Sequence, residues 1–158
     1  MSMRSYVRIG LAFLVCYGAG CISSFFVDAS AGSWYASLEK PFFTPPASVF
    51  APAWFVLYGL MATALSIVWI KDPNAEDMTG WVPIFFIHLV ANMAWTIFFF
   101  GFHTVFIALI DIFILVCMVL LLLCAAWRID RRASYLLLPY LTWVLFALLL
   151  NITIWVMN

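Results

Sequence analysis

Charged residues are scarce in this sequence. Only 9% of its 158 residues are Asp, Glu, Lys or Arg, whereas 68% are hydrophobic, and the mean hydropathy is +1.14. A soluble domain carries about one quarter charged residues, and a water-soluble fold of this size has no means of hiding so much apolar surface. The composition therefore predicts an integral membrane protein. The formal net charge of zero also argues against a basic surface that binds nucleic acid.

Motifs for metal binding and for common catalytic chemistry are missing as well. The four cysteines lie within apolar runs, without a Cys-x-x-Cys spacing or a Cys/His cluster. The sequence has no phosphate-binding glycine loop, nucleophile elbow or zinc-binding helix. We therefore expect no metal site and no cofactor. We interpret the cysteines as small buried hydrophobic residues.

Apolar runs divide the sequence into five expected membrane spans. They cover about residues 6–27, 48–70, 81–100, 104–127 and 135–157, and loop 1 occupies 28–47. About 20 apolar residues cross the hydrocarbon core as a helix, in which the backbone bonds to itself. The first run follows two arginines, as in a signal peptide, but it is long enough to be a retained span. We expect an all-α bundle of five membrane helices that forms one domain over 1–158.

Lysine and arginine residues are distributed unevenly between the two ends of this expected bundle. Six of the seven fall in the N-terminus, the second loop and the fourth loop, which share one side of the membrane. Lys40 in loop 1 lies on the other side. The positive-inside rule places the six in the cytoplasm. This predicts a cytoplasmic N-terminus, with loop 1 and the C-terminus facing outward.

Loop 1 contains the segment WYASLEKPFFTPP (34–46), which is apolar yet interrupted by three prolines. Prolines fix φ and lower the entropy that a loop loses when it becomes ordered. We expect a short helix from Trp34 to Glu39 that ends before Pro41, with Trp34 or Tyr35 pointing into the bundle. The segment is then a lid over the outward helix ends. The alternative is that it anchors the protein at the membrane surface.

Four amide or ionisable side chains lie within the expected spans, where such groups are costly and often functional: His88, Asn92, Asp111 and Asn151. Counted from the outward helix ends, Asn92, Asp111 and Asn151 lie at a similar depth beneath loop 1. They are candidate ligand contacts. The alternative is hydrogen bonding between helices, worth about 1 kcal/mol for each group. His88 lies deeper, and we expect it to have a packing role.

Aromatic residues gather on single faces of three expected helices. At about 100° per residue, the residues that share a face are Trp54 with Tyr58, then Asn92, Trp95 and Phe99, and then Tyr140, Trp143, Ala147 and Asn151. The other tryptophans lie near span ends, which is typical of aromatic belts. Flat apolar walls with a few hydrogen-bonding groups suit a flat, mostly apolar ligand with polar edges. The alternative is dense aromatic packing in the core of a bundle.

Several segments resemble one known family. They are WYASLEKPFFTPP, FAPAWFVLY (50–58), LVANMAWTIFFFG (89–101), ALID (108–111) and LLLPYLTWVLFALLLN (136–151). The sequence is similar over nearly its whole length to the TspO/translocator protein family, also called tryptophan-rich sensory proteins or peripheral-type benzodiazepine receptors. Its C-terminal NITIWVMN lacks the Tyr and Arg of the cholesterol consensus in animal members, as in bacterial members.

The resemblance implies a five-helix bundle, usually a homodimer, with a pocket closed by loop 1. The implied ligands are tetrapyrroles such as protoporphyrin and haem, sterols or other lipids, and synthetic benzodiazepine-site drugs. Pocket positions of the family correspond to Trp34, Tyr35, Pro46, Trp54, Asn92, Trp95, Trp143 and Ala147. With the residues identified above, the candidate ligand-binding set also includes Tyr58, Phe99, Asp111, Tyr140 and Asn151.

Three functions remain open on these grounds. The first is a membrane receptor or sensory protein for tetrapyrroles. The second is light-dependent breakdown of porphyrin, for which the family resemblance implies Trp54 and Trp143 as reactive tryptophans. The third is transport of porphyrin or lipid, which the lack of an inverted repeat weakens. A bacterial membrane is the expected location, with the charge asymmetry favouring the inner membrane over the outer one.

Overall fold

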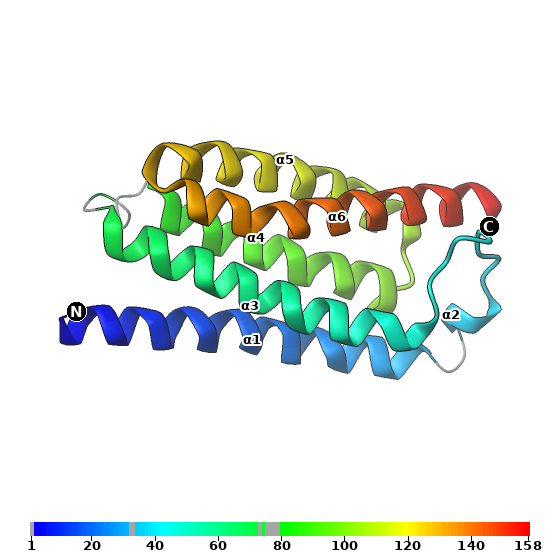
Figure 1. The fold of residues 1–158 in the computed structure, drawn as a ribbon. Helices are drawn as coiled ribbons and strands as arrows, with labels where there is room; N and C mark the ends of the chain where they lie inside the picture. The colour runs from blue at the N-terminus through cyan, green and yellow to red at the C-terminus, as the bar shows by residue number, and fades with distance from the viewer. Residues whose placement is uncertain (1, 32–33, 73, 75–79) are drawn as a thin grey trace.

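The protein is a bundle of long helices that run lengthwise beside one another (Figure 1). The computed structural model describes residues 2–31, 34–72, 74 and 80–158. The long helices are α1 (Met3–Ala31), α3 (Ala47–Lys71), α4 (Trp81–Thr96), α5 (Val105–Ile129) and α6 (Arg131–Met157). Within the described ranges, five helical stretches are long and apolar enough to cross a membrane, α4 being extended to Gly101. The expected all-α, five-helix fold is confirmed.

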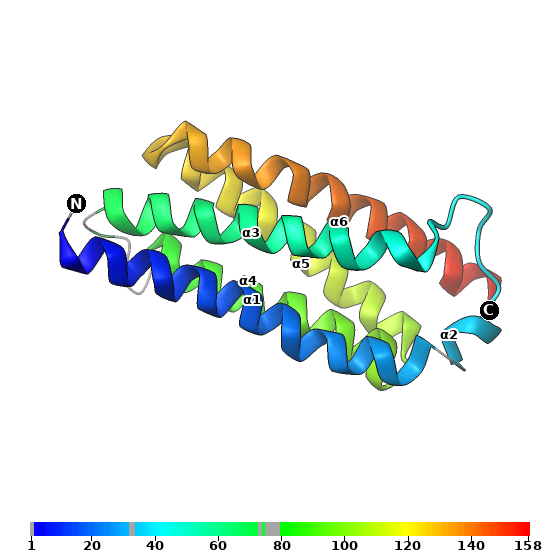
Figure 2. The same cartoon turned by 60° about the horizontal axis from the view of Figure 1, so that its bottom comes forward.

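The five helices close into a ring. In spatial order α1 packs on α3, α3 on α6, α6 on α5, α5 on α4, and α4 back on α1. The N-terminus lies at one end of the bundle, and the C-terminus lies at the other end beside loop 1 (Figures 1 and 2). An odd number of spans requires this separation of the termini.

The side chains on the outside of the bundle are mostly apolar, as a surface that faces lipid requires. Large hydrophobic residues such as Leu14, Ile87, Phe113 and Leu138 are exposed. The interior combines a hydrophobic core with buried polar groups, among them His88. The apolar exterior is the opposite of that of a soluble bundle, and with the five apolar helices it makes the protein a multi-pass integral membrane protein.

Two helix boundaries differ from the sequence-based expectation. Helix α1 continues to Ala31, so less of loop 1 is extended than expected. Helix α6 begins at Arg131, because the Asp130 side chain accepts a hydrogen bond from the Arg132 N–H at 2.8 Å and caps the first turn. The cap allows the helix to start in the charged RIDRRAS segment (128–134) rather than after it.

The expected break near GFHT (101–104) is present and has an unexpected form. Helix α4 passes into a π-helical segment, η1 (Ile97–Gly101), before the chain turns. The Phe102 N–H donates to the Ile97 carbonyl at 2.8 Å, and His103 adopts a positive φ of 58°. π-Helical turns are wider than α-helical turns and often occur near functional sites. The segment η1 changes the direction in which the side chains after Thr96 point.

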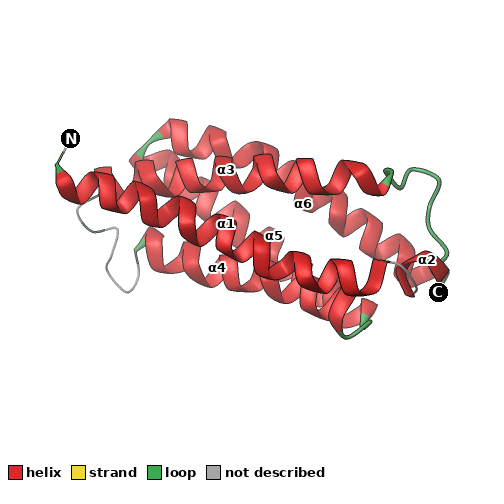
Figure 3. Cartoon of the chain, turned by 90° about the horizontal axis from the view of Figure 1, so that it is seen from below, coloured by secondary structure: helices red, strands yellow, loops and turns green. Residues whose placement is uncertain are grey.

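Loop 1 contains the short helix α2 (Trp34–Ser37), which ends two residues before the expected position. The chain after α2 then passes beside the C-terminus before it reaches α3 (Figure 3). Pro46 is exposed and lies directly before the first residue of α3. Loop 1 therefore covers the same end of the bundle to which the outward halves of α3 and α6 lead.

Candidate ligand-binding site

Two tryptophans from different helices face each other in the loop 1 half of the bundle. Trp54 of α3 and Trp143 of α6 have ring centroids 6.5 Å apart and planes at 83°. Both side chains are half-buried, and neither indole N–H donates a hydrogen bond to a described residue. The pair forms an apolar corner with two unused donors, which is a suitable wall for a flat ligand.

The corner extends through neighbouring aromatic side chains. Phe50 packs edge-on to Trp143 at 5.9 Å, and Phe146 lies against the same ring at 5.9 Å. Phe43 of loop 1 contacts Phe146 at 6.5 Å. The aromatic surface is thus continuous from the bundle interior to the loop.

A buried hydrogen-bond network forms the inner side of the Trp54 ring. The Tyr58 hydroxyl donates to Asn92 Oδ1 at 2.8 Å, and Asn92 Nδ2 donates to the Tyr140 hydroxyl at 3.0 Å. The Tyr140 oxygen lies 2.8 Å from His88 Nε2, and all four side chains are buried. This network joins α3, α4 and α6. His88 Nδ1 also contacts the Phe85 carbonyl at 3.3 Å, so both ring nitrogens have partners within the protein.

A second polar contact lies nearer to the end of the bundle. Trp95 Nε1 donates to Asn151 Oδ1 at 3.0 Å, and Asn151 Nδ2 donates to the Val105 carbonyl at 3.0 Å. The Trp95 ring stacks on Phe99 with centroids 5.4 Å apart. Asn151 has both of its amide partners within the protein, so it acts here as a link between α4, α5 and α6.

The two aromatic residues at the start of loop 1 join this second group. The Trp34 ring stacks on His103 at 4.3 Å and meets Phe99 edge-on at 5.6 Å. Tyr35 contacts Phe99 and Phe100 at 6.2 and 5.5 Å. Burial raises the pKa of the Tyr35 phenol above its ordinary value, so its hydroxyl stays protonated. Helix α2 therefore covers η1 and does not reach Trp54 or Trp143.

Two side chains hold the rest of loop 1 in place. Lys40 Nζ donates to the carbonyls of Tyr35, Ala36 and Leu38 at 2.7, 3.3 and 2.8 Å, and it lies 4.9 Å from the centre of the Tyr35 ring. These bonds satisfy the free carbonyls at the end of α2. The Asn158 side chain pairs with the Glu39 backbone in both directions at 3.0 Å. Loop 1 is thus fixed to the last turn of α6.

Comparison with known proteins identifies the fold. The family model described as the TspO/MBR family matches residues 12–156. The chain belongs to the TspO/MBR family. It is 38% identical over 152 residues to the Tryptophan-rich protein TspO of Archaeoglobus fulgidus, covering 96% of this chain and 97% of the relative. It is 32% identical over 148 residues to the Translocator protein of Homo sapiens, covering 92% and 87%. Protein CrtK of Rhodobacter capsulatus is 31% identical over 155 residues, covering 98% and 94%.

The candidate residues of this TspO/MBR family member fall into two groups and three outliers. The inner group is Trp54, Tyr58, Asn92, Tyr140 and Trp143, and the outer group is Trp34, Tyr35, Trp95, Phe99 and Asn151. Ala147 is half-buried one turn from Trp143 on α6, and Pro46 lies at the rim. Asp111 lies on α5, where its Oδ2 atom is buried without a hydrogen-bond partner among the described residues.

Some residues of the site were missed by the sequence reasoning. Phe50 lies four residues before Trp54, and Phe146 three residues after Trp143, so helical spacing alone could have placed both beside the indole pair. The pairing of Asn158 with Glu39 joins distant parts of the chain, and local sequence carries no signal for it. Gly20 is also required beside the site, because the ring carbon Cε2 of Tyr58 would lie 2.7 Å from an added Cβ.

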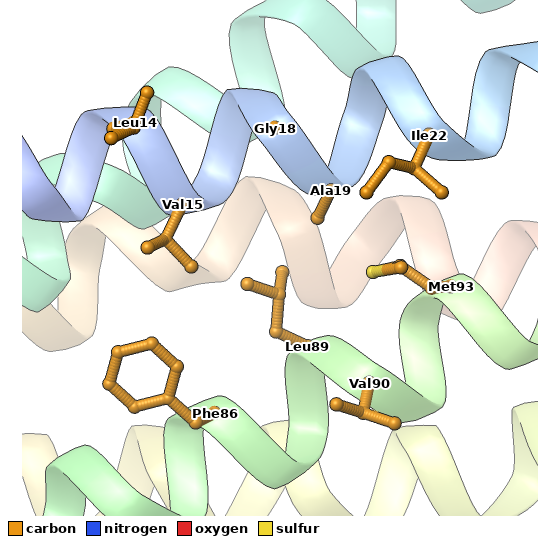
Figure 4. Close-up of a pocket in the computed structure, with 9 residues that line it drawn as sticks. All are labelled: Leu14, Val15, Gly18, Ala19, Ile22, Phe86, Leu89, Val90 and Met93. Carbon is orange, nitrogen blue, oxygen red and sulfur yellow. The ribbon is translucent and has the colours of Figure 1, made fainter.

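Open grooves on the protein lie away from this site. One, of about 440 Å³, runs between α1 and α4 and is lined by Leu14, Val15, Gly18, Ala19, Ile22, Phe86, Leu89, Val90 and Met93 (Figure 4). Another, of about 470 Å³, lies between α4 and α5. Their linings are almost entirely apolar, and exposed residues such as Leu14 and Val90 place the first on the lipid-facing surface. Without donors or acceptors they offer no means of recognising the polar edge of a ligand.

Proposed function

We propose that the protein is a membrane receptor that binds tetrapyrroles, such as protoporphyrin or haem, beneath loop 1. The observation that carries the proposal is the perpendicular Trp54–Trp143 pair, whose two indole N–H groups donate to none of the described residues. Sterols and other lipids are a second ligand class for the same site. The tetrapyrrole class itself comes from the family resemblance, because the names of the relatives specify no ligand.

The chemistry of the corner suits such a ligand. A tetrapyrrole presents a broad apolar face and a polar edge, and half-buried indole rings provide matching apolar area. The Tyr58–Asn92–Tyr140 network lies behind Trp54 and provides hydroxyl and amide groups at a fixed depth. The ligand would therefore lie against the indoles, with its edge toward this network.

Titration of the purified protein with protoporphyrin in detergent micelles tests the proposal. Trp54→Ala and Trp143→Ala are each expected to weaken binding by roughly 1–3 kcal/mol, the value of a buried aromatic side chain. The matched control is Trp127→Ala, since Trp127 is exposed and packs on Tyr135 at the opposite end of the bundle. Equal losses in all three variants would show a general loss of folding and would contradict a site at Trp54 and Trp143.

Light-dependent breakdown of porphyrin is the second candidate function. It is favoured by the contact of Trp54 with both Tyr58 and Tyr140, at 5.6 and 6.4 Å, because the electron-rich faces of neighbouring rings attract the positive charge that forms when an indole loses one electron. Illumination of the protein with bound protoporphyrin should then give a new product spectrum that Trp54→Phe and Trp143→Phe reduce. If protoporphyrin binds and its spectrum does not change on illumination, breakdown is contradicted and the receptor function remains supported.

Transport is the third candidate. It is tested by measuring the flux of ligand into liposomes that contain the protein.

The proposal includes the surroundings of the receptor. We place it in a bacterial membrane, and in the inner one where there are two, because of its charge asymmetry. We also expect a homodimer, as the family resemblance implies. Membrane fractionation checks the first point, and light scattering of the detergent-solubilised protein checks the second. A protein–detergent complex with the mass of one chain would contradict the dimer.

A further inference from the structure

Trp54 is in ring contact with two buried tyrosines whose hydroxyl groups differ in one chemical respect. The ring centroids of Tyr58 and Tyr140 lie 5.6 and 6.4 Å from that of Trp54. The Tyr58 hydroxyl donates to an amide oxygen of Asn92, whereas the Tyr140 oxygen lies 2.8 Å from an imidazole nitrogen of His88. An amide oxygen does not take up a proton near neutral pH, and an imidazole does.

The position of each proton in this network follows from the groups that only accept. The Phe85 carbonyl can only accept, so His88 Nδ1 carries the hydrogen that points to it. The imidazole is fully buried and no carboxylate of a described residue is in hydrogen-bond contact with it, so it is neutral and its Nε2 accepts. The Tyr140 hydroxyl therefore donates to His88 Nε2.

The orientation of the Asn92 amide agrees with this assignment. Its Nδ2 donates to the Tyr140 oxygen at 3.0 Å, which uses a lone pair of that oxygen and leaves the Tyr140 proton for His88. The opposite orientation would take the Tyr140 proton onto Asn92 and force His88 Nε2 to donate. His88 Nδ1 would then present a lone pair to the Phe85 carbonyl. Only one arrangement satisfies every group.

We propose that Tyr140 and His88 form a redox-active pair that reduces Trp54 after its one-electron oxidation. An oxidant removes one electron from the Trp54 indole and is itself reduced by one electron. Tyr140 passes an electron to Trp54, and its phenolic proton moves to His88 Nε2 in the same step. Trp54 is restored, and the products are a neutral Tyr140 radical and an imidazolium at His88. Return of one electron to Tyr140 and of the proton from His88 regenerates the starting state.

The pair would give the candidate site a way to survive a photo-oxidising ligand. A neutral tyrosyl radical stored beside a histidine spares the indole from irreversible oxidation. This role rests on the proposed tetrapyrrole site for its physiological oxidant, a photoexcited tetrapyrrole. The electron and proton steps do not depend on that ligand, so they are testable without it.

Pulse radiolysis of the full-length protein in detergent, with azide and no tetrapyrrole, provides the test. Azidyl radicals oxidise tryptophan, and the decay of the tryptophanyl absorption and the rise of tyrosyl absorption are then followed. Trp127 and Tyr135 form another ring contact at 5.4 Å, so the Tyr140 signal is defined as the part lost in Tyr140→Phe. Tyr135→Phe is the matched control, because it removes the hydroxyl of a tyrosine that packs on a tryptophan outside the candidate site. It is expected to keep the Tyr140 signal.

The role of His88 is tested by the rate at which the Tyr140 radical forms. His88→Asn is expected to slow formation of the Tyr140 radical on the order of a hundredfold, the lower end of what a positioned base contributes. The unchanged protein should also show slower radical formation in D₂O, a readout that needs no variant if His88→Asn does not fold. No signal lost in Tyr140→Phe, or a rate indifferent to both His88→Asn and D₂O, would overturn the pair.

An illumination experiment with protoporphyrin distinguishes failure of the redox pair from failure of the proposed function. Illumination of the protein with protoporphyrin, whose binding is measured first by titration, should give the same Tyr140 signal. Failure of protoporphyrin to bind, with a positive radiolysis result, removes the proposed ligand and leaves the redox pair supported. Binding of protoporphyrin with a negative radiolysis result would support the proposed ligand and overturn the redox pair.

Discussion

The side chain of Asn158 and the backbone of Glu39 form a two-way pair. Asn158 Nδ2 donates to the Glu39 carbonyl, and the Glu39 N–H donates to Asn158 Oδ1, both at 3.0 Å. The same Nδ2 also donates to Ile154 at 2.9 Å, which orients the amide on the last turn of α6. The Asn158 side chain thus connects loop 1 to the last turn of α6.

Asn158→Ala should therefore loosen loop 1 without unfolding the bundle. Each exposed hydrogen bond contributes about 1 kcal/mol or less, so amide exchange at Glu39 should accelerate by roughly fivefold. Hydrogen exchange with mass spectrometry over residues 34–46 measures this. Asn74→Ala, at the opposite end of the protein, is the control. Unchanged exchange in Asn158→Ala would mean that other contacts hold the loop.

Substitutions in loop 1 can distinguish a lid over the bundle from an anchor at the membrane surface. Trp34 and Tyr35 contact Phe99 and are half-buried, whereas Phe42 is 100% exposed. If the loop is a lid, replacing Trp34 and Tyr35 by alanine should accelerate protoporphyrin dissociation, and Phe42→Ala should not. Stopped-flow displacement measures the rates. If only Phe42→Ala has an effect, and it acts on membrane insertion, the loop is an anchor.

Gly20 and Gly18 on α1 should respond differently to the same substitution. An added Cβ at Gly20 would lie 2.7 and 2.9 Å from Tyr58 ring carbons, whereas at Gly18 it would meet nothing within 4 Å. Gly20→Ala should destabilise the protein by about 1–3 kcal/mol through overpacking and displace Tyr58 from Asn92. Gly18→Ala should be neutral or stabilising, because alanine favours helix. Thermal unfolding in detergent compares the two.

The turn between α5 and α6 should make stability sensitive to acid. A hydrogen bond from Lys71, a second from the Arg132 N–H and the charges of both residues hold the pKa of the Asp130 carboxyl below its ordinary value. A lowered folded-state pKa stabilises the fold above the unfolded value near 4, and this contribution is lost as the pH falls through the lowered value.

Asp130→Asn keeps an acceptor for the helix cap and removes the charge. The variant should lose stability at pH 7, and the difference from the unchanged protein should shrink below about pH 4. Melting temperatures at pH 7 and pH 3 measure this. A difference of the same size at both values would assign the effect to capping alone.

The charge distribution predicts orientation. Six of the seven lysines and arginines belong to the N-terminal side, so reporter fusions should place the N-terminus in the cytoplasm and the C-terminus outside. The two termini lie at opposite ends of the bundle, as this orientation requires (Figure 1). A cytoplasmic C-terminus would mean that the charge rule is overridden in this protein.

Helix number and the aromatic faces of α3 and α6 were predictable because both depend on local composition and on a fixed angle per residue. Trp54 with Tyr58, and Tyr140 with Trp143, lie together as expected. On α4, Phe99 stacks on Trp95 as a shared face predicts, but it falls in the π-helical segment, where the 100° rule fails, and its packing with Trp34 was not predictable. The η1 geometry depends on tertiary contacts that no short segment encodes.

The three hydrogen bonds of Lys40 bear on the rate at which an anionic ligand reaches loop 1. Lys40 is the only lysine or arginine on the loop 1 side in the expected topology, and its ammonium is occupied by backbone carbonyls while Glu39 lies exposed next to it. Asp28 also belongs to loop 1, so the loop carries two acids against one lysine. This side therefore has no positive field to attract an anion, and diffusion of an anion toward it is not accelerated. The association rate of a carboxylated ligand should not fall as the ionic strength rises, and the apolar part of the ligand, already dissolved in the bilayer, would determine how often it reaches loop 1.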